Sequence, residues 1–595
     1  MVHTRVLLMF GRRWWAYPLT VVLALAALAA AVRPADAAAV PDISVVQGRY
    51  GWVLRDGDGR EVTLRGFNVS GSTKLTETGL LPFHSTADAA KSAQAMRDLT
   101  GANAIRFLIS WEGVQPARDR IDTAYLARAV AQIREFTNRG IYVLLDYHQD
   151  LYSAHLFDED SWYDGDGAPK WVIDAGDYPD EFCGICFLWG QNMQTNAAVR
   201  EAQYDFWRNH AGVQDAFLSQ AGTTMAYLKQ ALPSASFARI MGFDPWNEPF
   251  DGGLSGGTGV QWEQTYLVPF YQRFRSTMDA NGWSAKPAFV EPLVFWNTVY
   301  AEQGGMAGLP AFGARYVFNS HYYDGPRLTL DLSPASDGVY AGPMNRIRDR
   351  ALALGTAPFV SEFGNAMTND RTPWMIRGMY QGMDAGVAGK SWWTSPASGG
   401  TVLSNTMWHW DIYSGRHASG ESGDAWNDED HSAVTVNSAG AVVPRLDIRV
   451  LDRLFPSAVG GQTLAFAYED LARSGYGGAG TQQAWLIAPS SMPAVSSLVS
   501  GRQYGVLVWR GTSAALHLPA SFTPSTAVVV SDVPSSAVGI ALEEGSTVAR
   551  QLVISAPTNG VHVALVVNPG VPVSASALAS ARTELLAWRT THFGS

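Results

Sequence analysis

Cysteine is scarce in this chain, which has two cysteines among 595 residues, Cys183 and Cys186. A structural zinc site needs four ligands, and the sequence has no second cysteine pair to supply them. The string Cys-Gly-Ile-Cys would suggest redox chemistry in a cytosolic protein. Here it lies in a long predicted loop with no thioredoxin-like strand before it. We therefore predict a local disulfide between Cys183 and Cys186.

Charged residues are also few, at 16%, whereas hydrophobic residues make up 47%, a globular rather than a disordered composition. The net charge of −11 lacks the basic excess that a nucleic-acid partner requires. No cluster of metal ligands stands out, so we predict no metal and no cofactor. The length favours about two folded domains.

Long apolar runs are missing after the N-terminus, and the first residues resemble an export signal. Arg12 and Arg13 precede an apolar stretch from Tyr17 to Val32, which is short for a membrane span. The small residues Ala35-Asp36-Ala37-Ala38 would suit cleavage near Ala37. We predict a signal peptide over residues 1–37 and a secreted protein. An uncleaved membrane anchor is the alternative.

The next part of the chain alternates strand-like and helical patterns, which is typical of a parallel α/β fold. Helical patterns cover Ala124–Arg139, Asn196–Leu232, Val268–Asn281 and Thr372–Ala385. Eight strand-like runs indicate a (β/α)₈ TIM barrel over residues 45–450. They are Leu64–Val69, Ala104–Ile109, Ile141–Asp146, Arg239–Asp244, Ala288–Val294, Arg315–Ser320, Pro358–Ser361 and Gly389–Trp393.

The pattern changes near Pro456, where short β-rich segments separated by Gly, Ser and Pro turns begin, with no helix between them. We predict a small C-terminal β-sandwich domain over residues 456–595, with a last helix at Ala575–Thr590. The segments are Gln483–Ile487, Gly505–Trp509, Ala527–Ser531, Gln551–Ile554 and Val561–Val567.

Two glutamates follow buried strand-like runs, in Trp246-Asn247-Glu248-Pro249 and Val360-Ser361-Glu362-Phe363-Gly364. A carboxylate at the C-terminal tip of a barrel strand points into the usual catalytic face of that fold. Paired carboxylates that flank one scissile bond are the machinery of glycoside hydrolysis. The sequence therefore predicts that Glu248 and Glu362 are a catalytic pair.

Other polar residues also stand within or at the ends of the predicted strands. Arg106 lies inside an apolar strand, and a buried arginine needs a partner such as an active-site carboxylate. The others are His148, Asn247, His321, Tyr323 and Trp393. In this order they resemble the strand-end signature of the family-five glycoside hydrolases.

Within that family the chain is similar to the endoglycoceramidases. The resemblance rests on Asp146 through Ser153, Gly242 through Pro249, and Asn68 through Lys74. It implies that Lys74 and Asp150 contact the sugars next to the cleavage point, and it also implies a C-terminal β-sandwich. The implied partner is a glycolipid or oligosaccharide, and we expect transient contact with a membrane or micelle surface.

The resemblance and general chemistry together suggest a role for each residue. Glu362 would be the nucleophile, with Tyr323 and Arg106 lowering its pKa, and Glu248 the acid/base. Asn247 would bind the sugar 2-OH, His148 and His321 would orient the sugar and the carboxylates, and Trp393 would stack under the sugar at the cleavage point.

Three functions remain open from the residues. The first is a retaining endo-β-glycosidase that cuts between the glycan and ceramide of a glycosphingolipid. The second is the same chemistry on glucosylceramide, a steryl glucoside or a soluble β-glucan or mannan. The third is a non-catalytic carbohydrate- or lipid-binding protein. The aromatic residues of the loop from Asp150 to Thr195 suit a lipid-facing wall, although they would also stack sugars.

Overall fold

The computed structural model describes residues 42–594 except 71–72, 75, 77–78, 162–163, 185–189, 254–257, 299–303, 331–333, 368, 414–429, 473–484 and 523–526. Residues 40–595 form one compact unit. The predicted signal peptide and Cys186 lie outside the described residues. Among the described helices, none has the length and apolar character needed to cross a bilayer.

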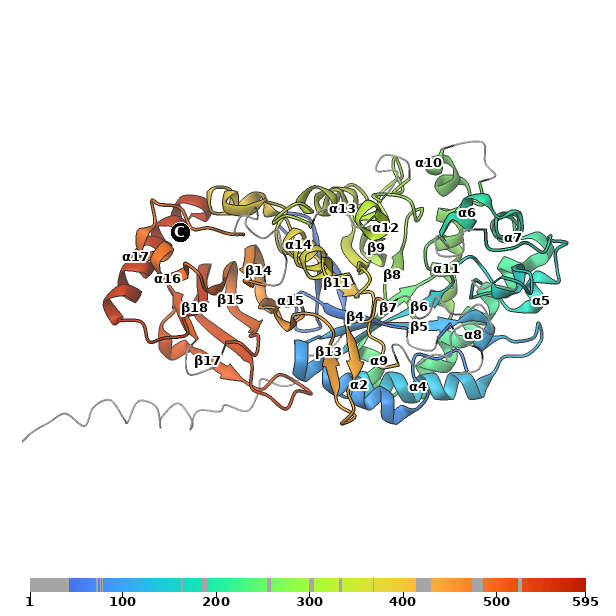
Figure 1. Cartoon of the computed structure of the whole chain (residues 1–595), viewed down its shortest axis with the longest axis horizontal. Coiled ribbons are helices and arrows are strands. Elements are labelled where there is room, and N and C mark those ends of the chain that lie inside the picture. The colour runs from blue at the N-terminus through green and yellow to red at the C-terminus, as the bar shows by residue number, and fades with distance from the viewer. Residues whose placement is uncertain are drawn as a thin grey trace, which may run out of the picture. The chain divides into compact units, whose positions relative to one another are not determined.

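Eight parallel strands, β4 to β11, close into a barrel, which confirms the predicted fold class (Figure 1). Seven of them coincide with predicted runs to within a few residues. The strands are β4 (Arg65–Val69), β5 (Ala104–Ser110), β6 (Tyr142–His148), β7 (Ile240–Asp244), β8 (Ala288–Val290), β9 (Tyr316–His321), β10 (Ala357–Glu362) and β11 (Ser404–Met407).

Helices follow the barrel strands, and local signals fix their ends. In α2 (Thr86–Thr100) the Ser85 side chain accepts the Asp88 N–H, and Gly101 ends the helix at φ 64°. Such caps stabilise a helix by about 1 kcal/mol. The other long helices are α4 (Thr123–Thr137), α7 (Ala197–Trp207), α8 (Val213–Ala231), α11 (Val268–Ala280), α13 (Ala341–Ala353) and α14 (Thr372–Asp384).

Shorter helices lie between these elements. They are α3 (Trp111–Val114), α5 (Lys170–Ile173), α6 (Asn192–Thr195), α9 (Ser234–Ala238), α10 (Gly259–Trp262), α12 (Gly325–Leu330) and α15 (Ile448–Leu451). The helical pattern predicted over Asn196–Leu232 forms two helices, α7 and α8, with a break between them. Asn209 and Ala211 have φ of 55° and 49°, a left-handed conformation that interrupts a right-handed helix.

The eighth barrel strand is not where the sequence predicts it. Gly389–Trp393 lies in a 3-10 helix, η7 (Gly389–Thr394), and β11 closes the barrel instead. Trp392 and Trp393 pack on Trp588 of α17 (Ala575–Phe593), with ring centroids 5.6 and 5.1 Å away. In contrast, β11 reads Ser-Asn-Thr-Met, and its Ser404 Oγ accepts the Leu64 N–H at 3.0 Å. A search for apolar runs therefore selects the wrong segment.

Alternation along the strands divides the barrel interior into an apolar floor and a polar layer. Side chains two residues apart on a strand face the same side. The floor residues share one buried cluster with the hairpin of β1 (Ser44–Gln47) and β2 (Trp52–Arg55); they include Ala104, Leu144, Phe289 and Val317. Two residues further along the same strands stand four buried polar residues, Arg106, Asp146, Glu291 and Asn319. The polar layer thus faces the C-terminal ends of the strands.

An antiparallel sheet forms the C-terminal region, consistent with the predicted β-sandwich. Its order is β1-β2-β3-β14-β15-β18-β16, with β17 also paired to β18. The further strands are β3 (Glu61–Val62), β14 (Phe455–Glu469), β15 (Gln503–His517), β16 (Val528–Ser531), β17 (Val538–Ala541) and β18 (Gln551–Asn568). Because β3 pairs with β14, residues from before the barrel complete this sheet. The domain limits 45–450 and 456–595 stay predictions.

The long strands bend where glycines allow close approach. A Cβ on Gly461 would lie 2.0 Å from the Arg510 carbonyl oxygen, and one on Gly511 would lie 2.2 Å from that of Gly460. The pairing shifts register at these glycines. Leu507 from before the bend and Leu516 from after it enter the same buried cluster. The two halves of the strands therefore enclose one core, as in a sandwich.

The C-terminal prediction also contained errors. The strand β14 was missed, and a helix, α16 (Pro493–Val499), separates it from β15, although we expected no helix among the β segments. Within Gln483–Ile487, residues 485–487 are described and form a turn rather than a strand. Tyr504 donates its hydroxyl to the Leu486 carbonyl, and Trp485 packs into the core beneath α17. Trp485 and Leu486 are therefore buried in a loop, whereas Ile487 is exposed by 46%.

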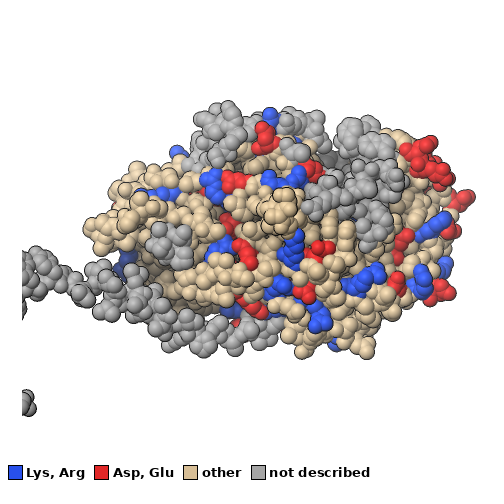
Figure 2. All heavy atoms as spheres, turned by 60° about the horizontal axis from the view of Figure 1, so that its bottom comes forward, with Lys and Arg blue, Asp and Glu red and all other residues tan. Residues whose placement is uncertain are grey.

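Figure 2 shows one face of the molecule, on which basic and acidic side chains lie interspersed among a larger uncharged area. This distribution agrees with the low content of charged residues, 16%.

Candidate active site

The centre of the polar layer is Arg106, which is fully buried. Its guanidinium nitrogens lie 2.9 Å from Asp146, 2.9 Å from Asp244, 3.1 Å from Glu291 and 2.6 Å from Glu362. Burial alone would lower the pKa of Arg106, but these carboxylates raise it above its ordinary value. Arg106 thus contacts Glu362, one of the two glutamates that the sequence predicts to be catalytic. Arg106, on β5, therefore pairs with four carboxylates that lie on or directly after β6, β7, β8 and β10.

Glu362, the last residue of β10, lies between two donors. Arg106 donates to its Oε1 at 2.6 Å, and the Tyr323 hydroxyl donates to its Oε2 at 2.9 Å. We expected these partners to depress its pKa. Instead burial raises the pKa of Glu362 above its ordinary value, although His321 and Arg106 lower it. Arg106 and Tyr323 therefore hold the carboxylate in one orientation, but the donors do not outweigh the effect of burial on its pKa.

Glu248 follows β7 and has a backbone φ of 41°, a left-handed value that is unusual for a residue with a side chain. Its Oε1 lies 2.8 Å from His321 Nδ1, and its own N–H donates to Glu291 Oε2 at 3.1 Å. One oxygen of Glu248 lies within 4.8 Å of one oxygen of Glu362. This short separation suits two carboxylates that act on one bond.

His321, at the end of β9, joins the two glutamates. Its Nδ1 is 2.8 Å from Glu248 and 3.5 Å from Glu362, and its Nε2 is 3.1 Å from Glu291. Burial lowers the pKa of His321, but Glu291 and Glu362 raise it well above its ordinary value. The ring thus lies among the carboxyl groups of Glu248, Glu362 and Glu291, and the charges of Glu291 and Glu362 favour its protonated form.

Asn247 is held in one orientation. Its Oδ1 accepts from Arg106 at 2.8 Å, and its Nδ2 donates to the Gln149 carbonyl at 3.0 Å. Gln149 in turn donates its side-chain amide to the Asn247 carbonyl at 2.7 Å. This reciprocal pair joins the loop after β6 to the loop after β7, beside Glu248.

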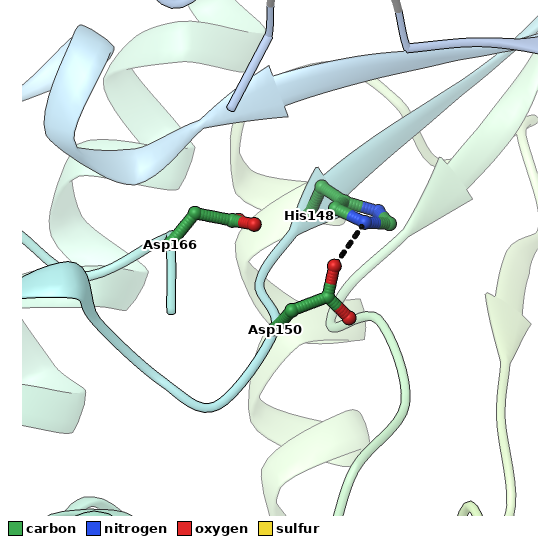
Figure 3. A group of neighbouring side chains, drawn as sticks. All are labelled: His148, Asp150 and Asp166. Atoms are coloured by element: carbon green, nitrogen blue, oxygen red, sulfur yellow. Dashed lines mark hydrogen bonds and ion pairs between the residues drawn. The ribbon is translucent and has the colours of Figure 1, made fainter. Parts of the chain in front are cut away.

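A second cluster of charged side chains follows β6. His148 lies between Asp146 at 2.9 Å and Asp150 at 3.1 Å. Lys74 Nζ is 2.6 Å from the same Asp150 oxygen. Burial lowers the pKa of His148, but Asp150 and Asp146 raise it to about 10. Figure 3 shows His148 at the end of its strand and Asp150 in the loop that follows.

Asp166 adds a carboxylate that the sequence did not indicate. It comes from the same loop, and Figure 3 shows it facing His148 and Asp150. Its N–H donates to the Asp150 carbonyl at 2.8 Å, and its Oδ2 is buried without a hydrogen-bond partner in the described part of the chain. Burial and the charge of Asp150 raise the pKa of Asp166 to about 7.

Two groups of described side chains have the composition of a metal site, with ligand atoms within 4.8 Å of one another. They are His148, Asp150 and Asp166, and Glu248, His321 and Glu362. In each group a cation of the protein already contacts a carboxylate, Lys74 on Asp150 and Arg106 on Glu362. We therefore interpret both groups as ion-paired networks of the protein.

Trp393 is not part of this site, which corrects the prediction. Its indole N–H donates to the Leu486 carbonyl at 3.2 Å within the C-terminal core. Trp408, directly after β11, lies beside the charged side chains at the strand ends, where we expected Trp393. Its ring stacks on His148 at 5.3 Å, and Lys74 Nζ is 4.8 Å from its centroid. In the sequence, the string Met407-Trp408-His409-Trp410 after the polar run Ser404-Asn405-Thr406 is the signal that points to this tryptophan.

The aromatic loop is more buried than its composition suggested. Tyr152 belongs to the main core, and Phe157 and Trp171 pack against it. Phe182 is exposed by 44%. Trp162, Tyr163, Phe187 and Trp189 lie outside the described residues. Cys183 is disulfide-bonded, and its predicted partner Cys186 is also outside them. Much of this loop therefore stabilises the fold.

Curated proteins with similar sequences include two endoglycoceramidases. The chain is 25% identical to endoglycoceramidase of Cyanea nozakii over 46% of its length and 56% of that protein. It is 28% identical to endoglycoceramidase I of Rhodococcus hoagii over 41% of its length and 45% of that protein. The matches thus span about half the length of these relatives.

Solved structures with the same fold include endo-glycoceramidase II from Rhodococcus sp. in a ganglioside GM3 complex. It has a TM-score of 0.59 at 20% identity, covering 87% of this chain and 99% of that one. Sterylglucosidase 1 of Cryptococcus neoformans gives 0.60 at 13% identity, covering 89% and 97%. Such low identities establish the fold alone.

The family comparison covers more than half of the chain. The model described as cellulase (glycosyl hydrolase family 5) matches residues 55–399 of 595. This range contains both glutamates, Arg106, His148 and His321, and it ends before β11 and Trp408. The match agrees with the parallel barrel and with the carboxylate pair at the C-terminal ends of its strands. The chain therefore belongs to glycosyl hydrolase family 5.

Proposed function

We propose that this protein is a secreted, retaining endo-β-glycosidase that cleaves the bond between the glycan and the ceramide of glycosphingolipids. The observation that carries the chemistry is the pair of Glu248 and Glu362, with carboxylate oxygens within 4.8 Å. Retaining glycosidases hold their two carboxyl groups about 5–5.5 Å apart, whereas inverting enzymes leave room for a water at about 6.5–9.5 Å.

The reaction has two displacements. The Glu362 carboxylate attacks the anomeric carbon and forms a glycosyl ester, while Glu248 donates its proton to the glycosidic oxygen and ceramide departs as an alcohol. Glu248, now a carboxylate, then takes a proton from water as the water attacks the anomeric carbon. The ester bond breaks, Glu362 regains its electron pair, and the glycan leaves as the β-anomer.

The companions hold the reacting groups and the sugar. Tyr323 and Arg106 orient Glu362, and Asn247 presents its amide beside Glu248, where it can bind the 2-OH. Lys74, Asp150 and His148 form a polar group next to the Trp408 ring, which suits a sugar with polar edges and an apolar face.

Similar proteins support a glycolipid substrate. Besides the two endoglycoceramidases, one similar structure is endo-glycoceramidase II from Rhodococcus sp. as a lactosyl-enzyme intermediate. A glycosyl-enzyme intermediate is also what the mechanism proposed here requires. Relatives that are glucosylceramidases make glucosylceramide the alternative substrate.

The substrate class is tested by comparing initial rates on ganglioside GM3, glucosylceramide and a soluble β-glucan. We expect the ganglioside to react fastest and detergent to raise its rate strongly, because the lipid must leave a micelle or membrane. Preferred cleavage of glucosylceramide would favour the alternative substrate. Vigorous cleavage of the glucan without activity on either lipid would contradict the proposal.

We also propose export through the signal at residues 1–37 and transient contact with a lipid surface. Phe182, exposed by 44%, lies in the loop that follows β6, and Leu328, exposed by 36%, lies in α12, which follows β9; both segments start from the C-terminal ends of barrel strands. We expect Phe182→Ser with Leu328→Ser to slow hydrolysis of micellar ganglioside and to leave a soluble aryl glycoside unaffected. The matched control is Leu352→Ser on α13, exposed by 52%. Equal loss on both substrates would exclude the contact.

Substitution of Trp408 should affect activity, whereas substitution of Trp393 should affect stability. We expect Trp408→Ala to lower kcat/KM on an aryl glycoside by about 10–100-fold, since a buried apolar contact contributes about 1.5–3 kcal/mol. Trp393→Ala should destabilise the fold by about 3–5 kcal/mol with unchanged kcat/KM per folded molecule. Kinetics and urea unfolding of both variants provide the measurement, and the reverse pattern would restore Trp393 to the site.

A further inference from the structure

A third glutamate in the polar layer, Glu291, has contacts that the two-carboxylate mechanism does not use. It follows β8 and is buried, with 2% of its surface exposed. We propose that Glu291 is a positioning residue that holds Glu248 and His321 in the geometry needed for proton transfer to the leaving group. This inference rests on the proposed glycosidase function and deepens it.

The two oxygens of Glu291 reach both parts of the acid/base arrangement. Oε2 accepts the backbone N–H of Glu248 at 3.1 Å, and Oε1 lies 3.1 Å from His321 Nε2. The opposite nitrogen of the same ring, Nδ1, lies 2.8 Å from Glu248 Oε1. One carboxylate therefore contacts the main chain of Glu248 and the ring that contacts its side chain.

The conformation of Glu248 requires such support. Its φ of 41° is left-handed, and a residue with a side chain keeps this conformation only where its surroundings hold it. The hydrogen bond from its N–H to Glu291 is one such restraint. Without it, the backbone could relax and carry the carboxyl group away from the scissile oxygen.

Charge favours the same arrangement. Burial raises the pKa of Glu291, but His321 and Arg106 lower it to about 2, so the carboxylate is ionised at working pH. An ionised Glu291 keeps His321 as an imidazolium, with a donor on each nitrogen. The ring is then held by charge attraction to Glu291, 3.1 Å from Nε2, and by the 2.8 Å contact of Nδ1 with Glu248.

A simpler explanation is that Glu291 only balances the buried charge of Arg106. Its distance to that guanidinium is 3.1 Å. Arg106 also has Asp146, Asp244 and Glu362 as partners, at 2.9, 2.9 and 2.6 Å. Charge balance therefore does not need a fourth carboxylate, whereas the contacts to Glu248 and His321 come from Glu291 itself.

The test uses aryl β-lactosides with leaving groups of different pKa, from 2,4-dinitrophenol to 4-methylphenol. A good leaving group needs no general acid, and a poor one does. For Glu291→Gln we expect kcat/KM to fall by about tenfold or more on the 4-methylphenyl lactoside and by less than about threefold on the dinitrophenyl lactoside, because general acid catalysis contributes about 10²–10⁴-fold. A purely structural role would lower both rates equally.

The matched control is Glu263→Gln. Glu263 is equally buried and accepts backbone N–H groups of Leu293 at 2.9 Å and Met306 at 2.7 Å. We expect this variant to lose stability with no change in the leaving-group dependence. Should Glu291→Gln fail to fold, Glu291→Asp retains the charge but shortens the reach, and the same selective loss is expected.

The outcomes separate the two proposals. If the wild type hydrolyses none of the lactosides, the proposed function fails. If the wild type is active and the Glu291 variants lose nothing, or lose the same factor on every leaving group, the positioning role alone is overturned. Selective loss on poor leaving groups, shared by His321→Gln and not increased in the double variant, supports it.

Discussion

Glu362→Ala is expected to lower kcat by at least about 10⁴-fold on every substrate, because no glycosyl ester can form without the nucleophile. The residue lies at the end of β10 between Arg106 and Tyr323, which hold it in place but cannot replace it. Circular dichroism and thermal unfolding of the variant should show a folded protein. Turnover within about tenfold of the wild type would remove Glu362 from its role.

Glu248→Ala should behave differently. Formation of the glycosyl ester needs no acid when the leaving group is activated, so this variant should still react with a dinitrophenyl glycoside. The intermediate then accumulates, and added azide should release it as the β-glycosyl azide. Azide rescue of Glu362→Ala with a β-glycosyl azide as product would exchange the two roles, because a β-azide needs two displacements through a glycosyl ester, whereas an α-azide from this variant is what loss of the nucleophile predicts.

Arg106→Met is expected to cause the largest loss of stability of any single change in the barrel. It removes a fully buried cation and leaves Asp146, Asp244, Glu291 and Glu362 without their shared partner. Removing one member of a buried ion pair costs about 3–5 kcal/mol. We expect a loss of this size in urea unfolding, together with loss of activity, because Glu362 loses its donor.

A matched surface arginine provides the control for that experiment. Arg273 is exposed by 43% at its side chain and pairs with Asp215, which is exposed by 58%. Arg273→Met should change the free energy of unfolding by less than about 1 kcal/mol. If Arg106→Met were no more destabilising than Arg273→Met, the guanidinium would not be the element that stabilises the polar layer.

Seven barrel strands could be predicted because each combines an apolar run with a turn before a helical pattern. The eighth could not, since β11 reads Ser-Asn-Thr-Met and forms its hydrogen bonds inside the barrel. The apolar run at Trp392 and Trp393 is buried for another reason, the packing against α17. An apolar run therefore predicts that a segment is buried, but it does not predict whether the segment packs in the barrel or against the C-terminal helix.

The sequence predicts those site residues that lie within or shortly after the barrel strands. Glu248, Glu362, Arg106 and His321 follow from position alone, because parallel strands bring their C-terminal ends together. Glu291 was missed because the predicted strand Ala288–Val294 ran through it, whereas β8 ends at Val290. Only the structure shows that Glu291 stands directly after the strand, on its inward-facing side, and accepts the Glu248 N–H.

Loop residues were the least predictable part of the site. Lys74 and Asp150 entered through family resemblance, and the structure places them 2.6 Å apart. Asp166 is 16 residues from Asp150 in sequence, and its carboxylate approaches only because its N–H pairs with the Asp150 carbonyl. A pairing of two irregular loop segments leaves no periodic pattern in the sequence.

Proton NMR of the products first formed from ganglioside GM3 in detergent tests the central claim most directly. Endo-cleavage by double displacement predicts that the intact oligosaccharide appears first as its β-anomer, together with free ceramide, and that the α-anomer follows by mutarotation. Initial release of the α-anomer, or of a monosaccharide from the far end of the glycan, would contradict the account.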